Sequence, residues 1–283
     1  MASPLKTYED EREYVKNLSP NKNTQHTYIM TYNKIRKVIE KPLMIRDADQ
    51  DFLIQTIKDV STSSQTRNVA LSVIFRIREG MNNNKLELYR IQNNKQRNRD
   101  SLARQSAEFR KYENVDYMDL VKYTDEQYKN KDYVSHIVNY LLVHFNVRNQ
   151  DVNVYITTDK SEDLEGNYIQ IINGSRVRYV RNNYKTIATY GRKSKDITTK
   201  SFVKSAIALQ KQYGDDYHIL GKDIKSTSLT KKIVSYTMLG MTEASVFKIV
   251  LKTFRNDADI LKNISESRGT SMPEIVNEYD VLS

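Results

Sequence analysis

The 283-residue chain contains no cysteine, no tryptophan, only four prolines and only eight glycines. Without cysteine, the protein cannot form disulfide bonds or thiolate metal sites, and its composition suits a reducing compartment. No apolar run approaches the roughly 20 residues that a membrane span needs, and residues 1–10 lack the apolar core of a signal peptide. These absences predict an intracellular protein without a membrane partner, either in the cytoplasm or nucleus of a host cell or packaged in a virion.

Basic residues outnumber acidic ones along the chain. The 45 Lys and Arg residues against 35 Asp and Glu residues give a formal net charge of +10. A surplus of this size favours a polyanionic partner, because Lys and Arg side chains neutralise phosphates and release their counterions. We therefore expect the protein to bind double-stranded DNA. A surface that is basic only for solubility is the alternative.

The first part of the chain is predicted to be helical. Residues 1–22 are polar and are expected to be partly mobile. Amphipathic helical patterns follow, and the last of them begins at "STSSQT" and stops at Gly80. They predict a compact helical domain over residues 1–81. Residues 82–112 are rich in basic side chains and poor in apolar ones, which predicts a basic helical connector.

Residues 113–283 combine helical and β patterns. Helices are expected at about 116–129 and 131–145. Three β-rich segments follow, "DVNVYIT", "NYIQIIN" and "RVRYVRNNYKTIATYG", and turn signals containing glycine join them. After Asp196 the pattern is again helical to the end of the chain. The predicted fold class is therefore mainly α with a small antiparallel sheet (α+β).

Motifs for metals and cofactors are missing from the sequence. It has no zinc, P-loop or dinucleotide-binding signature. The four histidines, His26, His136, His144 and His218, have no spacing typical of metal ligands. We therefore expect no metal site, no cofactor and no small-molecule substrate.

Several polar residues in the second half of the chain have a characteristic order and spacing. The segment "FNVRNQD" follows a long apolar helix and contains Arg148, with Asp151 three residues later. The segment "VRYVRNNYKTIATYG" offers Lys185 on an expected β-hairpin, and "RGTSMPEIVNEY" has Tyr279 nine residues after Thr270. In this order and spacing, these residues resemble the catalytic motifs of the tyrosine recombinases, the phage-type integrase family.

The resemblance covers most of the chain. The segments "NTQHTYIMTYNKIRKVI" and "SSQTRNVALSVIF" look like the first and last helices of the family's core-binding domain. The resemblance implies that residues 1–81 bind DNA, that residues 113–283 form the catalytic domain, and that the protein acts as a homo-oligomer on double-stranded DNA. The high content of Asn, Lys and Tyr resembles that of proteins from large DNA viruses.

The resemblance also implies a role for each residue. Transesterification at a phosphodiester needs a nucleophilic oxygen, cations at the non-bridging oxygens and an acid for the leaving 5′ oxygen. Tyr279 would form a 3′-phosphotyrosyl link, Arg148 would hold the phosphate with its forked guanidinium, and Lys185 would be the acid. Arg181 is the less favoured candidate for the role of the lysine.

Two positions depart from the family pattern. The family's His-x-x-Arg box aligns with "STSLTKKIVSY", where Ser228 has the His place and Lys231 the Arg place, and lysine lacks the bidentate fork. Thr270 stands where the family has His or Trp, and Arg268 is expected to compensate. The predicted catalytic residues are Tyr279, Arg148, Lys185, Lys231, Arg268 and Thr270, and the predicted DNA contacts are Arg67, Lys95, Arg97, Arg181 and Lys232.

Alternative interpretations remain for the residues and for the whole chain. Arg148 could pair with Asp151 or cap its helix, Lys185 could face solvent, and Tyr279 could be a buried aromatic residue. The two departures favour a second function, that of a catalytically degenerate recombinase fold serving as a DNA-binding, virion structural or packaging component. A type IB topoisomerase shares the chemistry but would also need the second arginine.

Overall fold

The computed structural model describes residues 7–39, 43–161 and 164–275, except for the side chains of residues 105, 108 and 109. The chain divides into two compact units, Met1–Gln105 (unit 1) and Ser106–Ser283 (unit 2). The division falls inside the range 82–112 that the sequence predicts as a connector. Each unit has its own hydrophobic core.

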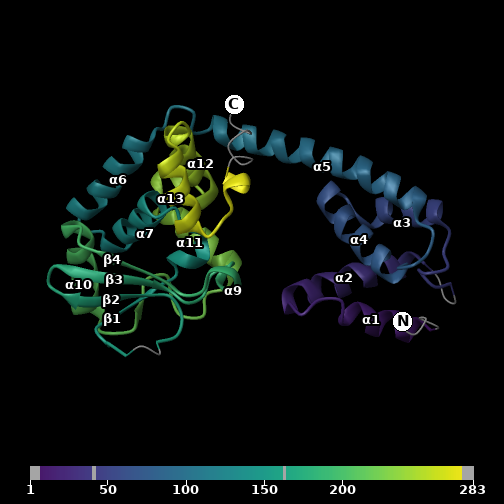
Figure 1. Cartoon of the computed structure of the whole chain (residues 1–283), viewed down its shortest axis with the longest axis horizontal. Helices are drawn as coiled ribbons and strands as arrows, with labels where there is room; N and C mark the ends of the chain where they lie inside the picture. Colours follow the sequence, from purple (N-terminus) through teal and green to yellow (C-terminus); the bar gives the residue numbers. More distant parts are fainter. Residues whose placement is uncertain (1–6, 40–42, 162–163, 276–283) are drawn as a thin grey trace. The chain divides into compact units, whose positions relative to one another are not determined.

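Unit 1 is built from helices (Figure 1). They are α1 (Tyr8–Lys16), α2 (Lys22–Val38), α3 (Gln50–Val60), α4 (Ser64–Ile77) and the first part of α5 (Asn84–Arg110). Four of these helices begin where a polar side chain accepts a hydrogen bond from the first turn, at Thr7, Asn21, Asp49 and Ser63. Such caps satisfy backbone N–H groups that have no partner within the helix, and this explains why the helices begin at these residues.

Helix α1 lies in the range that the sequence expects to be partly mobile. Thr7 and Asp10 form a capping box at its start, and Val15 and Glu11 are fully buried. The Glu11 carboxylate accepts a hydrogen bond of 3.0 Å from the backbone N–H of Arg46, which ties α1 to the loop before α3. The sequence gives only a weak signal for this helix, because the helix buries one narrow face and most of its residues are polar.

The core of unit 1 is formed by apolar side chains from α1 to α5. Its fully buried members include Tyr32, Ile35, Leu53, Ile57, Leu71, Ile74 and Leu86. Along α5, only Leu86 and Asn93 are buried among the side chains that the structure describes. The helix therefore packs through its first turns, while most of the side chains described on its remaining length face solvent.

Unit 2 combines helices with one sheet (Figure 1). Its helices are α6 (Tyr117–Lys129), α7 (Tyr133–His144), α8 (Asn149–Val152), α9 (Ile187–Tyr190), α10 (Lys200–Tyr213), α11 (Ser226–Tyr236), α12 (Glu243–Phe254) and α13 (Ala258–Arg268), with a 3₁₀ turn at Met238–Gly240. Its strands are β1 (Tyr155–Thr157), β2 (Tyr168–Asn173), β3 (Arg176–Arg181), β4 (Lys193–Ile197) and β5 (Tyr217–His218).

The sheet has the strand order β4-β3-β2-β1-β5. The prediction of a mainly α fold with a small sheet is confirmed, but the sheet is mixed, because β1 and β2 pair in parallel while the other neighbours are antiparallel. The β-rich piece expected over residues 176–191 is a strand only in its first part, β3; its second part contains α9, and the edge strand β4 follows it.

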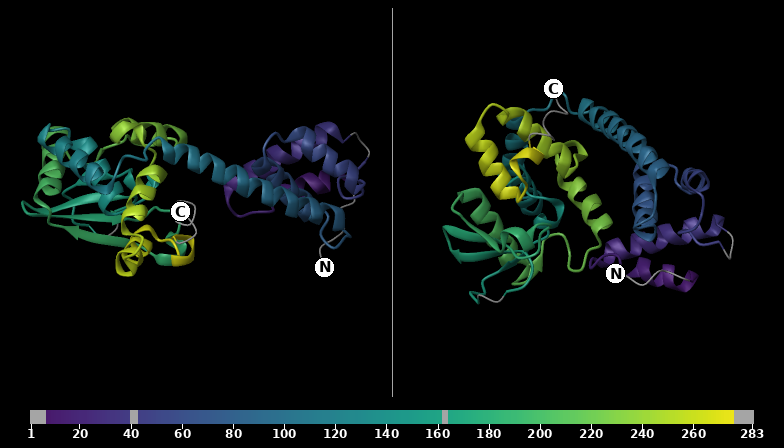
Figure 2. Two further views of the ribbon diagram at one scale, coloured as in Figure 1. Left: turned by 90° about the horizontal axis from the view of Figure 1, so that it is seen from above. Right: turned by 45° about the vertical axis from the view of Figure 1, so that its right-hand side comes forward.

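Helix α7 lies at the centre of unit 2. It buries Ile137, Val138, Leu141 and Leu142, and it packs against α6, α10, α11 and α12. Helix α10 packs on β1, β2 and β3 (Figure 2). No helix within the described ranges combines the length and hydrophobicity that crossing a bilayer requires. Because α7 ends just before Arg148, this central packing sets the position of the first predicted catalytic residue.

Candidate active site

The C-terminal end of α13 is surrounded by side chains that are distant in the sequence. The last carbonyl groups of a helix have no partner within it and carry a partial negative charge. Here, four consecutive carbonyls each accept a hydrogen bond from another segment. The pairs are Lys193 Nζ to Glu266 O, Arg181 Nη2 to Ser267 O (2.5 Å), Arg148 Nη1 to Arg268 O (2.9 Å) and Thr186 Oγ1 to Gly269 O (2.9 Å). Three cations thus converge on one helix end.

Arg148 leads into the short helix α8 and reaches the turn after α13 with both terminal nitrogens. Nη1 donates to the carbonyl of Arg268, and Nη2 donates to Thr270 Oγ1 at 2.6 Å. Burial, followed by the nearby positive charge of Arg268, lowers the pKa of the Arg148 guanidinium. Of the predicted catalytic residues, the structure therefore joins Arg148, Arg268 and Thr270 by direct hydrogen bonds.

Arg268 is held in place by the loop after α7 and by α12. Its Nη1 donates to the carbonyl of Asn146 at 3.0 Å, and its Nη2 forms a 2.5 Å ion pair with Glu243. Its guanidinium carbon lies 3.8 Å from the centre of the Phe247 ring. Sequence reasoning missed Glu243 and Phe247, because nothing local to α12 indicates a partner beyond its own helix.

A buried ion pair adjoins the end of α13. Arg181 Nη1 lies 3.1 Å from Asp151 Oδ2, and the two residues are 5% and 0% exposed. Burial raises the pKa of the Asp151 carboxyl, although Arg181 opposes this shift. To the Asp151 carboxylate, Arg148 donates only its backbone N–H, at 3.4 Å, while its carbonyl accepts from the backbone N–H of Asp151 at 2.9 Å. Arg181, predicted from the sequence to contact DNA, is instead enclosed in the protein and bonded at both ends of its guanidinium.

Lys193 is a site residue that the sequence prediction did not include. It is the first residue of β4, and its ammonium lies 4.9 Å from the ring centre of Tyr190 and 5.9 Å from that of Tyr184. Burial, followed by the charge of Arg181, lowers the pKa of this ammonium. The alternation in "RKSKDI", which ends at the buried Ile197, was the available signal for a strand with lysines on one face.

Lys185 lies in the loop between β3 and α9, not on a strand. Its side chain is exposed, but its neighbour Thr186 bonds to the carbonyl of Gly269. Gly269 has a φ of +63°, and a Cβ atom there would lie 2.6 Å from Thr186 Oγ1. The loop therefore approaches the turn closely, which keeps Lys185 next to the segment that Arg148 binds.

The predicted second box on α11 has no described contact with Arg148. Thr230 Oγ1 accepts a 3.3 Å hydrogen bond from Asn149, so α11 does adjoin the helix that follows Arg148. Lys231 is exposed to solvent. Lys232 donates to the carbonyl of Leu220 at 3.0 Å, within unit 2.

The remaining predicted residues lie elsewhere. Tyr279 falls outside the described residues, which end at Ile275. In unit 1, Arg67 Nε donates to the carbonyl of Ser61 at 3.2 Å, whereas Lys95 is exposed on α5. Arg97 lines a groove between α4 and α5.

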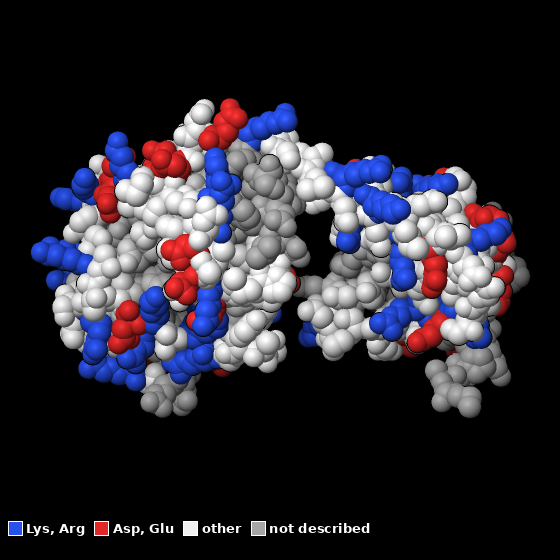
Figure 3. Space-filling view, turned by 45° about the horizontal axis from the view of Figure 1, so that its top comes forward, with Lys and Arg blue, Asp and Glu red and all other residues white. Residues whose placement is uncertain are grey.

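A second cavity adjoins the end of α13, between that helix and the strands β3 and β4. Its volume is about 710 Å³, and its lining includes Arg181, Arg192, Lys193, Lys195 and Glu266. Figure 3 shows lysine and arginine side chains spread over one face of unit 2, with fewer acidic ones between them. The arrangement is suited to binding an anion, because cationic N–H donors outnumber carboxylates in the cavity lining.

The described residues contain no group of three or more His, Cys, Asp or Glu side chains that could hold a metal ion. Comparison of the chain with protein-family models, with curated proteins and with solved structures finds no match. The function is therefore inferred from the site alone.

Proposed function

We propose that the chain is a DNA strand transferase of the tyrosine-recombinase type, which cleaves and rejoins double-stranded DNA through a 3′-phosphotyrosyl intermediate. One observation carries this proposal. Arg148, Lys193 and the loop with Lys185 meet at the end of α13, ten or so residues before Tyr279 in the chain. Three of the residues that the proposed chemistry uses or could use thus lie at one helix end, and Tyr279 follows that helix in the sequence.

The proposed reaction is a transesterification. The Tyr279 oxygen attacks phosphorus and loses its proton to water, the bond from phosphorus to the 5′ oxygen breaks, and the 5′ oxygen gains a proton from a lysine acid as it leaves. Arg148 neutralises the non-bridging oxygens with its forked donors, assisted by the Thr270 hydroxyl. The reverse reaction, with a 5′ hydroxyl as nucleophile, rejoins the strand.

Two lysines are candidates for the acid. Lys185 has the place that the family resemblance implies, and Lys193 is the lysine bonded at the helix end. A lysine with a lowered pKa gives up its proton more readily near neutral pH, and burial lowers the pKa of Lys193. The carbonyl of Glu266 would have to release Lys193 before it could donate to DNA.

A second candidate function keeps the fold without the chemistry. Both terminal nitrogens of Arg148 already donate within the protein, and Lys231 alone stands in the place of the second arginine. These observations favour a DNA-binding, virion structural or packaging component. Under either function we expect a homo-oligomer on double-stranded DNA, in the cytoplasm or nucleus of a host cell or within a virion.

Trapping the covalent intermediate tests the proposal. The full chain is incubated with nicked suicide duplexes from a randomised pool and denatured, and attached DNA is located by peptide mass spectrometry. We expect an adduct on Tyr279, and none in Tyr279→Phe. Tyr213→Phe, which changes an exposed tyrosine on α10, is the matched control and should keep the adduct.

The two candidate functions give different outcomes in this assay. An adduct that requires Tyr279 supports the strand transferase. DNA binding without any adduct, in the wild type and both variants, would leave the binding component as the better description.

A further inference from the structure

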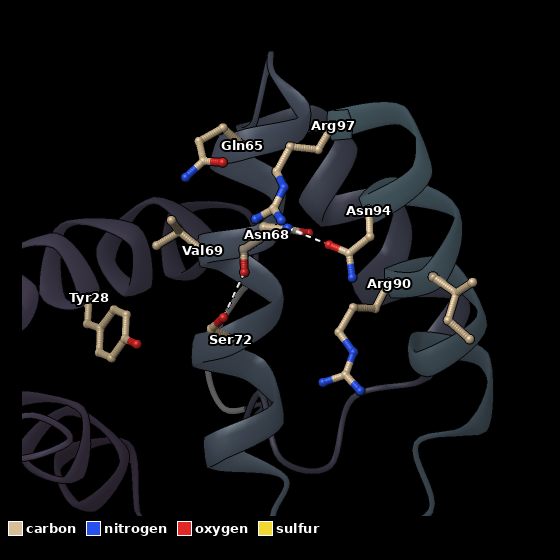
Figure 4. Close-up of a pocket in the computed structure, with 9 residues that line it drawn as sticks. Tyr28, Gln65, Asn68, Val69, Ser72, Arg90, Asn94 and Arg97 are labelled. Carbon is tan, nitrogen blue, oxygen red and sulfur yellow. Dashed lines mark hydrogen bonds between the residues drawn. The ribbon is translucent and has the colours of Figure 1, made fainter. Parts of the chain in front are cut away.

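An open groove runs between α4 and α5 in unit 1, with Tyr28 of α2 at its edge (Figure 4). Its volume is about 520 Å³, and a second hollow of about 410 Å³ shares Tyr28, Ser72 and Arg90 with it. Every described side chain that lines the two hollows is exposed or half-buried. Together they form one groove that is open to solvent along its length.

The groove is too long and too open for a site that encloses a small molecule. On α4 its lining extends from Gln65 to Arg76, which is about 16 Å along the helix axis. Small-molecule sites bury most of the surface of their ligand. A groove of this length with exposed walls suits a segment of polypeptide instead.

Positive charge dominates among the described residues of the groove. Its charged side chains are those of Arg76, Arg90, Arg97 and Glu79. The Arg90 guanidinium lies 4.7 Å from the ring centre of Phe75, and no described residue accepts a hydrogen bond from Arg90 or Arg97. The N–H groups of these two arginines are therefore available to carboxylates, which a guanidinium binds through two parallel hydrogen bonds.

A ladder of asparagines fixes one end of the groove. Asn93, which is 4% exposed, donates to the carbonyl of Ser64 at 2.8 Å and to Asn68 Oδ1 at 2.6 Å. Asn68 Nδ2 in turn donates to Asn94 Oδ1 at 2.6 Å, which ties α5 to α4. Because Asn94 Oδ1 is the acceptor in this bond, Asn94 Nδ2 faces the groove as a donor (Figure 4).

We propose that this groove docks an acidic amphipathic α-helix of a partner protein. Arg90 and Arg97 both point from α5 into the groove (Figure 4), and their separation of seven residues is about two turns, or about 10 Å. On a partner helix that runs alongside α5, acidic residues at positions i and i+7 have the same spacing and lie on one face. Each carboxylate would accept forked hydrogen bonds from one arginine.

The rest of the same helix face would contact the apolar and amide groups of the groove. Apolar residues at i+3 and i+4 lie between the two acids and would pack on Val69 and Phe75. Asn94 Nδ2 would donate to a side-chain oxygen of the partner. An α-helix is about 10–12 Å wide with its side chains, so it can lie along a groove between two helices.

This inference goes beyond the proposed function and does not rest on it. No described residue of the groove takes part in the proposed strand transfer, and the charge complementarity that carries the inference lies wholly within unit 1.

The test uses two synthetic, alanine-rich peptides of about 18 residues, a length that is helical in water. Both have the same composition, with two leucines and two glutamates. One has glutamate at its fourth and eleventh positions, on one face, and the other at its fourth and ninth positions, on different faces. Fluorescence anisotropy measures the binding of each labelled peptide to the full chain. We expect the first peptide to bind about 10-fold more tightly, because only it can pair with both arginines at once.

Substitutions in the groove test the individual contacts. Arg90→Gln and Arg97→Gln should each weaken binding of the first peptide about 10-fold. Replacing the glutamate at the eleventh position of that peptide by glutamine should abolish the effect of one of these substitutions and not of the other, since only one arginine pairs with it. Lys95→Gln is the matched control, because Lys95 is exposed on the same helix and is not among the described residues that line the groove. It should affect both peptides alike, and circular dichroism checks that each variant is folded.

Several results would overturn the inference. No binding, equal affinities for the two peptides, or an effect of Lys95→Gln as large as that of Arg97→Gln would leave at most attraction by net charge. A loss of duplex DNA affinity in Arg97→Gln as large as its loss of peptide affinity would assign the groove to nucleic acid. None of these results bears on the covalent adduct at Tyr279, which is measured without the peptides.

Discussion

Arg148 serves both the fold and the proposed chemistry. Its guanidinium satisfies the carbonyl of Arg268 and the hydroxyl of Thr270, which stabilises the turn after α13. The same forked donors suit a phosphate in the transition state of strand cleavage. Hydrogen bonds to the anion would offset the loss of these internal hydrogen bonds. Contacts that are strongest in the transition state change the rate more than the affinity, so Arg148 is expected to matter more for the reaction than for DNA affinity.

For Arg148→Ala we expect the rate of covalent adduct formation to fall about 10²- to 10³-fold, the effect typical of losing one preorganised donor. DNA affinity should fall only as much as the loss of one phosphate contact. Single-turnover cleavage and equilibrium binding measure the two quantities. Arg148→Lys controls for charge, and circular dichroism controls for folding. Equal losses of rate and affinity would make Arg148 an ordinary phosphate clamp.

His136 gives the protein a pH-dependent stability that is separate from the site. It is fully buried on α7, its Nδ1 lies 2.9 Å from Ser205 Oγ, and burial lowers its pKa to about 4. Unfolded histidine titrates near pH 6.5, so between these values the unfolded state binds more protons and acid favours unfolding. Burial lowers the pKa of His144 and His218 as well, which adds to the effect in the same direction.

From this shift we expect His136 to account for a loss of roughly 2 kcal/mol in unfolding free energy between pH 7 and pH 5. Urea unfolding of the wild type and His136→Gln at both pH values measures it. The variant should lose less stability on acidification than the wild type. His26→Gln, at an exposed position on α2, should retain the wild-type loss. An identical pH dependence in His136→Gln would contradict the prediction.

At the scale of elements, the end of α13 is the feature that organises unit 2. Carbonyls 266–269 accept hydrogen bonds from the residue before α8, from β3, from the loop before α9 and from β4. Cations are stabilising at helix C-termini, and here three cations and the Thr186 hydroxyl bring separate segments together. The left-handed turn at Gly269 lets the chain leave the helix while these contacts form.

Gly269→Ala should destabilise the protein by more than the approximately 1 kcal/mol typical of a positive-φ glycine, because the new Cβ would also meet Thr186 Oγ1 at 2.6 Å. Gly191→Ala measures the backbone cost alone, since Gly191 has a φ of +65° and open space around it. Gly174→Ala has neither problem and should be nearly neutral. Equal unfolding free energies for Gly269→Ala and Gly191→Ala would show that the close approach of Thr186 does not matter.

At the scale of the whole molecule, the charge of +10 is distributed over two units with separate cores. Unit 2 uses several cations internally, at the end of α13. Unit 1 leaves Arg90 and Arg97 without described acceptors in its groove. The two units are thus expected to contribute differently to DNA binding, with the phosphate chemistry in unit 2.

Binding of duplex DNA by the full chain should weaken steeply with salt. The log–log slope is expected to be about −0.9 for each phosphate that the protein neutralises. Fluorescence anisotropy over a series of salt concentrations measures the slope, and unfolding at each salt concentration controls for stability. A flat response would contradict every DNA-based function for this protein.

The sequence by itself determined most helices and the coarse fold class. The expected helix at 116–129 corresponds to α6, Tyr117–Lys129, and the stop expected at Gly80 follows the end of α4 at Ile77. Periodicity and capping are local properties, so neighbouring residues suffice to predict them. The sequence also indicated Arg148, Arg268 and Thr270, which the structure joins by hydrogen bonds.

Only the tertiary structure decided how the site is assembled. The bond from Arg148 to the carbonyl of Arg268 spans 120 residues, and that from Arg181 to Ser267 spans 86. Lys193 became a site residue, and Arg181 became buried, because β3 and β4 pack beside the end of α13. The parallel pairing of β1 with β2 likewise depends on long-range contacts. Such contacts depend on how whole elements pack together, and local sequence patterns carry no signal for them.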